Sequence, residues 1–182
     1  METFDLPLAG LTLVKPRVIG DTRGFFIETY SQTRYREAGI ECTFVQDNHS
    51  RSKRGTLRGL HYQSSPGQAK LIRVASGSIF DVAVDIRPGS PTFGQWYGAT
   101  LDDVEHAQLF VPVGFAHGFC VTSDVADVVY KVSSLYDAST EADLRWNDPD
   151  IGVNWPVAEP LLSARDQQAE SFADLAKRLR GR

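Results

Sequence analysis

Residues 78–86 read SIFDVAVDI, a stretch in which apolar side chains fall at every second position. From Phe80 onward one parity is wholly apolar and comprises Phe80, Val82, Val84 and Ile86. The other parity carries two carboxylates, Asp81 and Asp85. Because successive side chains of a strand point to opposite faces of the sheet, this alternation predicts a β-strand with one face in the core and the other bearing carboxylates.

Short runs of this kind recur along the chain, separated by Gly, Pro, Asn, Asp and Ser. The other predicted strands are residues 11–19, 25–30, 43–46, 56–63, 70–75, 95–100, 108–111, 118–122 and 126–136. Regular short strands between turn residues are typical of a β-sandwich or barrel rather than of βαβ units. Helices are predicted only over residues 31–38, with Ser31 as N-cap and Gly39 just past the end, and over residues 171–180. We expect one all-β domain, residues 1–182, with a C-terminal helix.

The composition is that of an ordinary globular domain, with 42% apolar and 23% charged residues and a net charge of −4. This charge argues against a nucleic-acid surface, which needs a concentrated basic patch. Residues 1–16 lack the basic region and apolar run of a signal peptide, and no stretch is long enough to span a bilayer. Cys42 and Cys120 have no CxxC spacing. We expect a cytoplasmic protein with reduced cysteines that binds neither nucleic acid nor membrane.

Residues 20–30, GDTRGFFIETY, are a predicted turn and strand that carries Arg23 and Glu28. Adjacent strand residues point to opposite faces, so Phe25 and Phe26 cannot both enter one core. One ring is expected to face a partner subunit or a planar ligand. The alternative is an edge hairpin whose aromatic pair packs into the core.

Residues 46–63, QDNHSRSKRGTLRGLHYQ, concentrate polar side chains where strand, turn and strand are expected. A lone histidine is more often a structural residue than a catalyst, but Gly59 leaves space beside His61 for a ligand or a β-bulge. Strict alternation puts Arg58 and His61 on opposite faces. Both serve one site only if the strand is bulged or twisted near Gly59.

Residues 111–119, VPVGFAHGF, contain a PxGxxH pattern that resembles the second half of the metal-binding motif of cupin barrels. The first half would supply an HxH pair and a nearby Glu, but only His61 stands there, followed by Tyr62 and Gln63. His61 and His117 alone leave a metal short of ligands. We therefore expect no metal and no cofactor, and we expect His117 to be free to hydrogen-bond a substrate.

The last candidate region is residues 126–166. Tyr130 and Tyr136 have the same parity, so an unbroken strand aims both to one side. The alternative is two core tyrosines with satisfied hydroxyls. Asp166 lies just before the predicted terminal helix, where alone it would pass for a helix-start residue.

Six segments together resemble the dTDP-4-dehydrorhamnose 3,5-epimerase family, in the expected order and over nearly the whole chain. They are GDTRGFF (20–26), QDNHSRSKRGTLRGLHYQ (46–63), KLIRVASGSIFDVAVDIRPGSPTFGQW (70–96), PVGFAHGF (112–119), YKVSSLYDASTE (130–141) and LSARD (162–166). The resemblance implies a cupin-type jelly-roll barrel and a homodimer whose N-terminal strand segment completes the partner's site. Ile19 departs from the family, where an aromatic residue is expected.

The resemblance also implies residue roles. His61 is the catalytic base, Asp166 orients it, Tyr130 is the acid on the opposite side of the sugar ring, and Lys70 lies near the C4 oxygen. The expected contacts to the nucleotide or sugar are Arg23, Glu28, Gln46, Asn48, Arg58 and His117. The partner's Phe26 and Tyr136 sandwich the thymine, so that Phe25 is left to face the core.

These groups suit epimerisation next to a ketone, which needs a base, a stabilised oxyanion and a proton donor on the other face. The expected reaction inverts C3 and C5 of dTDP-4-dehydro-6-deoxy-D-glucose and gives dTDP-4-dehydro-L-rhamnose, in dTDP-L-rhamnose biosynthesis. A mono-epimerase that inverts C3 or C5 alone, in an antibiotic-sugar pathway, is one alternative. An inactive sugar-nucleotide-binding module and a metal-dependent cupin are the others.

Overall fold

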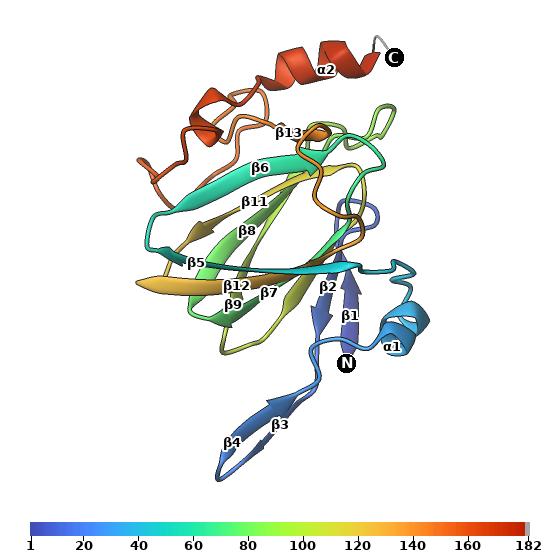
Figure 1. Ribbon diagram of the computed structural model, residues 1–182, viewed down its shortest axis with the longest axis vertical. Helices are drawn as coiled ribbons and strands as arrows, with labels where there is room; N and C mark the ends of the chain where they lie inside the picture. The colour runs from blue at the N-terminus through green and yellow to red at the C-terminus, as the bar shows by residue number, and fades with distance from the viewer. Residues whose placement is uncertain (181–182) are drawn as a thin grey trace.

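Two antiparallel β-sheets face each other around an apolar interior (Figure 1). This computed structural model describes residues 1–180, and residues 181–182 of the expected domain lie outside the described residues. The first sheet has the order β1 (Glu2–Asp5), β2 (Thr12–Lys15), β10 (Gln108–Val111), β7 (Lys70–Ser76), β12 (Val125–Val132) and β5 (Gln46–Lys53). The second has the order β13 (Glu141–Asp143), β6 (Leu57–Gln63), β11 (Phe115–Val121), β8 (Ser78–Asp85) and β9 (Trp96–Asp102). This arrangement confirms the expected all-β jelly roll.

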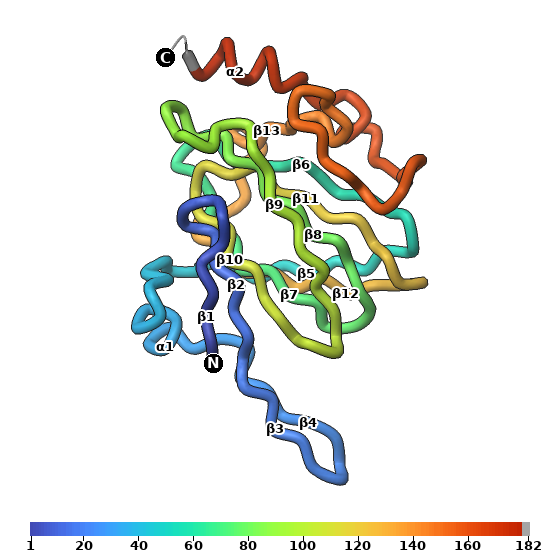
Figure 2. The backbone as a smooth tube through the Cα atoms, turned by 180° about the vertical axis from the view of Figure 1, so that it is seen from behind, coloured from blue at the N-terminus to red at the C-terminus, as the bar shows by residue number. Residues whose placement is uncertain are grey.

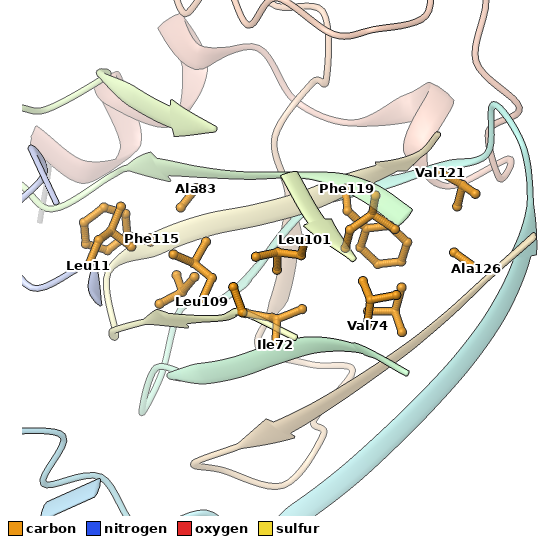
Figure 3. Close-up of a cluster of buried hydrophobic side chains, with 14 of the residues drawn as sticks. Leu11, Ile72, Val74, Ala83, Leu101, Leu109, Phe115, Phe119, Val121 and Ala126 are labelled. Atoms are coloured by element: carbon orange, nitrogen blue, oxygen red, sulfur yellow. The ribbon is translucent and has the colours of Figure 1, made fainter. Parts of the chain in front are cut away.

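The space between the two sheets holds the main hydrophobic core (Figure 3). Ile72 and Leu109 project into it from the first sheet, and Leu101 and Phe119 project from the second. All four are buried. The core runs along β11 from Phe115 to Val121.

Strand β8 has the two faces expected for residues 78–86, one apolar and one that bears carboxylates. Val82, Val84 and Ile86 pack against the C-terminal segment, which covers the outer face of the second sheet. The opposite face is also buried, because it points into the barrel, and both Asp81 and Asp85 are 0% exposed. The two carboxylates are therefore interior groups with interior partners.

Strand boundaries differ from the predictions mainly where strands are short or polar. Strand β5 runs from Gln46 to Lys53, whereas residues 43–46 were expected, because QDNHSRSK offers no apolar alternation to read. Its inward face lines a cleft rather than a core. The predicted strand over residues 11–19 is split into β2 and β3 (Val18–Asp21), and β1 and β13 were missed.

The helices lie near their expected positions. Helix α1 (Gln32–Glu37) begins after Ser31 and is followed by Gly39 at φ +87°, although the Ser31 side chain makes no cap hydrogen bond. Helix α2 (Phe172–Arg180) packs Leu175 and Leu179 onto the outer face of the second sheet. Among the described residues, neither helix is long and apolar enough to cross a membrane.

A two-stranded hairpin, β3 and β4 (Gly24–Ile27), projects from the barrel at the end opposite α2 (Figures 1 and 2). It pairs Ile19 with Phe26 and Gly20 with Phe25. Phe25 and Phe26 are 59% and 68% exposed, so the expectation that one ring enters the core is wrong. The hairpin extends beyond the barrel, and the Phe25 ring lies against His106, with ring centroids 4.6 Å apart.

Candidate active site

A cleft of about 310 Å³ opens between the two sheets beside the core. Strands β5, β7 and β12 form one wall, and β6, β11 and the segment around β13 form the other. Its lining includes eight of the predicted site residues: Gln46, Asn48, Arg58, His61, Lys70, His117, Tyr130 and Tyr136. The barrel thus brings together residues from both halves of the chain, at a volume within the range of small-molecule sites.

His61 and Asp166 form a close pair at this cleft. His61 Nε2 lies 2.6 Å from Asp166 Oδ1, and the Ser163 hydroxyl donates to Asp166 Oδ2 at 2.8 Å. Burial raises the pKa of Asp166, but the bonds and charge from His61 and the bonds from Ser163 outweigh it and lower the pKa overall. An ionised carboxylate only accepts hydrogen bonds, so His61 donates to Asp166 from Nε2 and directs its Nδ1 away from that bond.

The β6 strand is irregular between His61 and Arg58. Against β11, His61 pairs with His117 and Arg58 pairs with Phe119, so Gly59 and Leu60 of β6 oppose the single Gly118 of β11. This β-bulge shifts the alternation by one residue, and Arg58 and His61 both line the cleft. The irregularity that the sequence required is therefore present, and Arg58 Nε is held by the Ser52 hydroxyl at 3.1 Å.

Lys70 is a buried cation beside the base. Its ammonium donates to the backbone oxygen of His61 at 3.3 Å, and its side chain lines the cleft. Burial lowers the pKa of Lys70 from 10.5 to about 8, although Asp81 and Glu141 oppose that shift. Lys70 is therefore still mainly protonated at neutral pH and lies close to His61.

Tyr130 and Tyr136 both line the cleft, as their parity predicted, although β12 ends at Val132 between them. Burial raises the pKa of Tyr130, which keeps its phenol protonated at neutral pH. Tyr136 is 57% exposed at the rim, where its ring is open to a planar ligand. The alternative of two core tyrosines is wrong for Tyr136 and holds only in part for Tyr130, which also touches the main core.

His117 differs from its expected role. It is buried, and its Nε2 lies 2.9 Å from both oxygens of the buried Asp81. Burial is the main cause that lowers the pKa of His117. The expectation that His117 is free to hydrogen-bond a substrate is therefore wrong for one of its two ring nitrogens. Nε2 is bonded to Asp81, and Nδ1 is left for a ligand.

Strand β5 presents a row of polar side chains to the cleft. Gln46 Nε2 donates to Asn48 Oδ1 at 2.8 Å, and the backbone N–H of Tyr136 donates to Gln46 Oε1 at 3.3 Å. Asn48 pairs across the sheet with Tyr130. The amide groups are thereby held in place along the wall that faces His61.

Three predicted site residues do not reach this cleft within one chain. Arg23 and Phe26 lie on the projecting hairpin, where Arg23 binds Asp21. Glu28 accepts a hydrogen bond from Arg34 at 2.9 Å, near α1. Any role of these residues in a cleft of this kind requires a second chain.

The structure also adds residues that the sequence reasoning did not single out. Arg165 and Glu141 line the cleft and bind each other, and Asp143 holds Arg165 Nε at 2.6 Å. The bonds to Asp143 are the main cause that raises the pKa of Arg165. Both residues fall within the quoted segments YKVSSLYDASTE and LSARD, and their position next to Tyr136 and Asp166 was the available signal.

No group of three or more His, Cys, Asp or Glu side chains within residues 1–180 is arranged to hold a metal ion. Histidines 61 and 117 are cross-strand neighbours, and each is paired with a carboxylate. The arrangement of the cleft is that of a proton-transfer site, with a base, a cation and a phenol around one space.

Comparison with known proteins agrees with this geometry. The family model for dTDP-4-dehydrorhamnose 3,5-epimerase matches residues 5–174. A dTDP-4-dehydrorhamnose 3,5-epimerase of Pseudomonas aeruginosa is 49% identical over 96% of this chain and 97% of its own length. One of Neisseria gonorrhoeae is 51% identical over 97% of this chain, which spans 54% of that relative's length. A dTDP-4-dehydrorhamnose 3-epimerase of Streptomyces niveus is 42% identical over 96% of this chain and 85% of its own length.

Among solved structures, a dTDP-6-deoxy-D-glucose-3,5-epimerase of Legionella pneumophila, in complex with dTDP-4-keto-L-rhamnose, matches with a TM-score of 0.91. It is 45% identical, and the match covers 96% of each chain. The fold is therefore the cupin-type jelly roll of these enzymes. On the match of the family model and of full-length relatives, this chain belongs to the dTDP-4-dehydrorhamnose 3,5-epimerase family.

Proposed function

We propose that the chain inverts C3 and C5 of dTDP-4-dehydro-6-deoxy-D-glucose and yields dTDP-4-dehydro-L-rhamnose, a step towards dTDP-L-rhamnose. The observation that carries this proposal is the meeting of the His61–Asp166 pair, Lys70 and Tyr130 at one cleft. The names of the relatives support the same activity.

The chemistry follows from the positions of these groups. His61 Nδ1 takes the proton from a carbon next to the C4 ketone, and the electron pair of the C–H bond becomes an enolate with its charge on O4. The Lys70 ammonium stabilises that charge. The Tyr130 phenol then donates its proton to the same carbon from the other face, and water restores the protonation states of His61 and Tyr130. A positioned base contributes about 10²–10⁴ in rate to such a step.

The buried carboxylate of Asp166 orients the imidazole ring of His61. Asp166 fixes the tautomer of His61 and stabilises the imidazolium once the proton has been taken. Ser163 holds the Asp166 carboxylate in place, because its hydroxyl donates to Asp166 Oδ2 and accepts from the Asp166 backbone N–H at 3.0 Å. Gln46, Asn48, Arg58, His117 and Tyr136 surround this centre and are proposed to hold the nucleotide and the sugar.

The protein acts as a homodimer in this proposal. The hairpin β3–β4 presents Arg23 and two exposed phenylalanines away from its own barrel, where they lack a core to enter. Exposed aromatic residues on a projecting element are typical of an interface between subunits. The partner's hairpin would bring Phe26 over Tyr136, to enclose the base, and Arg23 and Glu28 towards the nucleotide. Both cysteines are free thiols, which supports the cytoplasm as the location.

A mono-epimerase is the second candidate, since a 3-epimerase is among the relatives. The double reaction is favoured by the names of the relatives and by the presence of His61, Tyr130 and Lys70 in one cleft. The test is NMR analysis of the product formed from dTDP-4-dehydro-6-deoxy-D-glucose. Inversion at both carbons supports the proposal, inversion at one carbon supports the mono-epimerase, and absence of any product contradicts both.

A further inference from the structure

The hydroxyl of Ser50 is a buried group in the cleft that has no hydrogen-bond partner. Within residues 1–180, its Oγ is the one buried side-chain oxygen or nitrogen in this condition. Its neighbours on the same face of β5 have hydrogen-bond partners. Asn48 Oδ1 accepts from Gln46 Nε2, and the Ser52 hydroxyl accepts from Arg58 Nε. A buried hydroxyl without a partner is costly, so such a group in a binding cleft points to a partner on the ligand.

The position of Ser50 along β5 shows which part of a substrate it faces. Tyr136 binds Gln46, which marks the end of the cleft where a planar base would stack. Asn48 lies opposite the proposed acid Tyr130. Ser50 follows two residues later, about 7 Å further along the strand and away from Tyr136. A nucleotide-linked sugar laid along this row therefore has its hexose beside Asn48 and Ser50.

The chemistry of the side chain narrows the choice of partner. A serine hydroxyl is neutral and both donates and accepts, which matches another hydroxyl, whereas a diphosphate is matched by charged donors. The hexose of the proposed substrate has free hydroxyls on C2 and C3. C3 is inverted in the reaction, so its hydroxyl changes direction, whereas the C2 hydroxyl keeps its configuration. Only the C2 hydroxyl can stay bound to a fixed serine throughout.

We propose that Ser50 Oγ binds the C2 hydroxyl of the hexose and thereby makes the enzyme selective for 2-hydroxy over 2-deoxy sugars. This inference rests on the proposed function and deepens it. The bond is formed alike in the ground state and in the transition state, so its loss raises KM more than it lowers kcat.

The test compares wild-type protein with Ser50→Ala on dTDP-4-dehydro-6-deoxy-D-glucose and on its 2-deoxy analogue. With the first substrate, Ser50→Ala is expected to lower kcat/KM about 3- to 10-fold, the scale of one neutral hydrogen bond. With the 2-deoxy analogue, the two proteins are expected to be equal. The affinity for dTDP alone is expected to stay unchanged, because the nucleotide lacks the hexose.

Thermal unfolding gives a second readout that separates a binding role from a structural one. Ser50→Ala removes an unpaired buried hydroxyl, so its Tm is expected to equal or exceed that of the wild type. Ser123→Ala is the matched control, since Ser123 Oγ donates to Val125 O at 2.7 Å and lies outside the cleft. This control is expected to lose Tm and to keep its kinetics.

Three outcomes overturn the inference. An unchanged kcat/KM in Ser50→Ala removes Ser50 from the site, and an equal loss on the 2-deoxy analogue removes the C2 hydroxyl as its partner. A loss of dTDP affinity assigns Ser50 to the nucleotide instead. If the wild type itself turns over neither substrate, the proposed function fails, and that result is distinct from a failure of Ser50 alone.

Discussion

Burial disfavours the charged form of Lys70, which is the form that the proposed mechanism needs. Its ammonium lies beside His61, where a cation is needed for the oxyanion, but burial lowers its pKa to about 8. A fall from 10.5 to about 8 corresponds to roughly 3 kcal/mol of differential cost for the charged form. The folded protein therefore holds a cation that its own interior disfavours.

Lys70→Met is expected to be more stable and much less active than the wild type. At pH 7 the free energy of unfolding rises, by at most about 3 kcal/mol, because a buried charge is removed. A lowered pKa in the folded state means that the wild type gains stability relative to Lys70→Met as the pH rises from about 8 towards 10.5. The activity of the wild type is expected to fall over the same range, as Lys70 loses its proton. Urea denaturation and a pH–rate profile measure both, and a less stable Lys70→Met would contradict this explanation.

Asp166→Asn tests whether the Asp166 carboxylate orients His61 and fixes its tautomer. Asparagine keeps the shape and an acceptor for Ser163 but no longer fixes the tautomer of His61. We expect kcat to fall about 10²–10⁴-fold, with little change in Tm or in dTDP affinity. A large loss of stability with unchanged kcat would instead make Asp166 a structural residue at the start of the 3₁₀-helix Asp166–Gln168.

Single residues were predicted unevenly. The resemblance to the epimerase family predicted His61, Asp166, Lys70 and Tyr130 as site residues, and the structure brings these four together. The sequence reasoning missed the pairing of His117 with Asp81, because the two are 36 residues apart and meet only across adjacent strands. Carboxylates on an alternating strand look solvent-exposed unless the barrel that encloses them is known.

At the scale of elements, the bulge in β6 decides which side chains share the cleft. Gly59 has φ +135°, and a Cβ placed on it would lie 2.5 Å from Gly118 Cα on β11. The two glycines allow β6 and β11 to approach closely where the register shifts. The sequence required an irregularity near Gly59 for Arg58 and His61 to meet, but its form depends on the partner strand.

Gly59→Ala is expected to disturb both stability and the site. The added Cβ meets backbone atoms, which cannot move aside cheaply, and the backbone conformation is one that alanine disfavours. We expect the Tm to fall by several degrees and kcat/KM to fall at least tenfold in the folded fraction, since Arg58 shifts relative to His61. Calorimetry and kinetics check this, with Gly89→Ala as control, because Gly89 also has positive φ but open space around its Cβ. Equal effects of the two substitutions would show that backbone strain alone is responsible.

For the molecule as a whole, the many short strands of the sequence predict the barrel. They do not predict that β3 and β4 form a hairpin outside it. The alternation in β8 and the turn residues predicted a barrel, and two opposed sheets are present. The adjacent Phe25 and Phe26 predicted that one ring leaves the core. Both rings do, because a hairpin outside the barrel has no core of its own to bury them.

Subunit complementation tests whether the hairpin serves the partner's cleft. Protein carrying Arg23→Ala and protein carrying His61→Ala are each expected to be nearly inactive. When they are mixed, dissociated and reassembled in equal amounts, half of the dimers combine both chains, and each has one intact site. About a quarter of the wild-type activity is then expected. No recovery would mean that Arg23 acts on its own chain's cleft or not at all.

In the proposed mechanism, His61 and Tyr130 move protons on opposite faces of one sugar ring. The most direct measurement is hydrogen exchange at C3 and C5 of dTDP-4-dehydro-6-deoxy-D-glucose in deuterated water, followed by NMR for the wild type, His61→Ala and Tyr130→Phe. The wild type is expected to give product with deuterium at both carbons, and His61→Ala is expected to give no exchange. Tyr130→Phe is expected to incorporate deuterium into recovered substrate with little inversion. Exchange at the wild-type rate in His61→Ala would contradict the account.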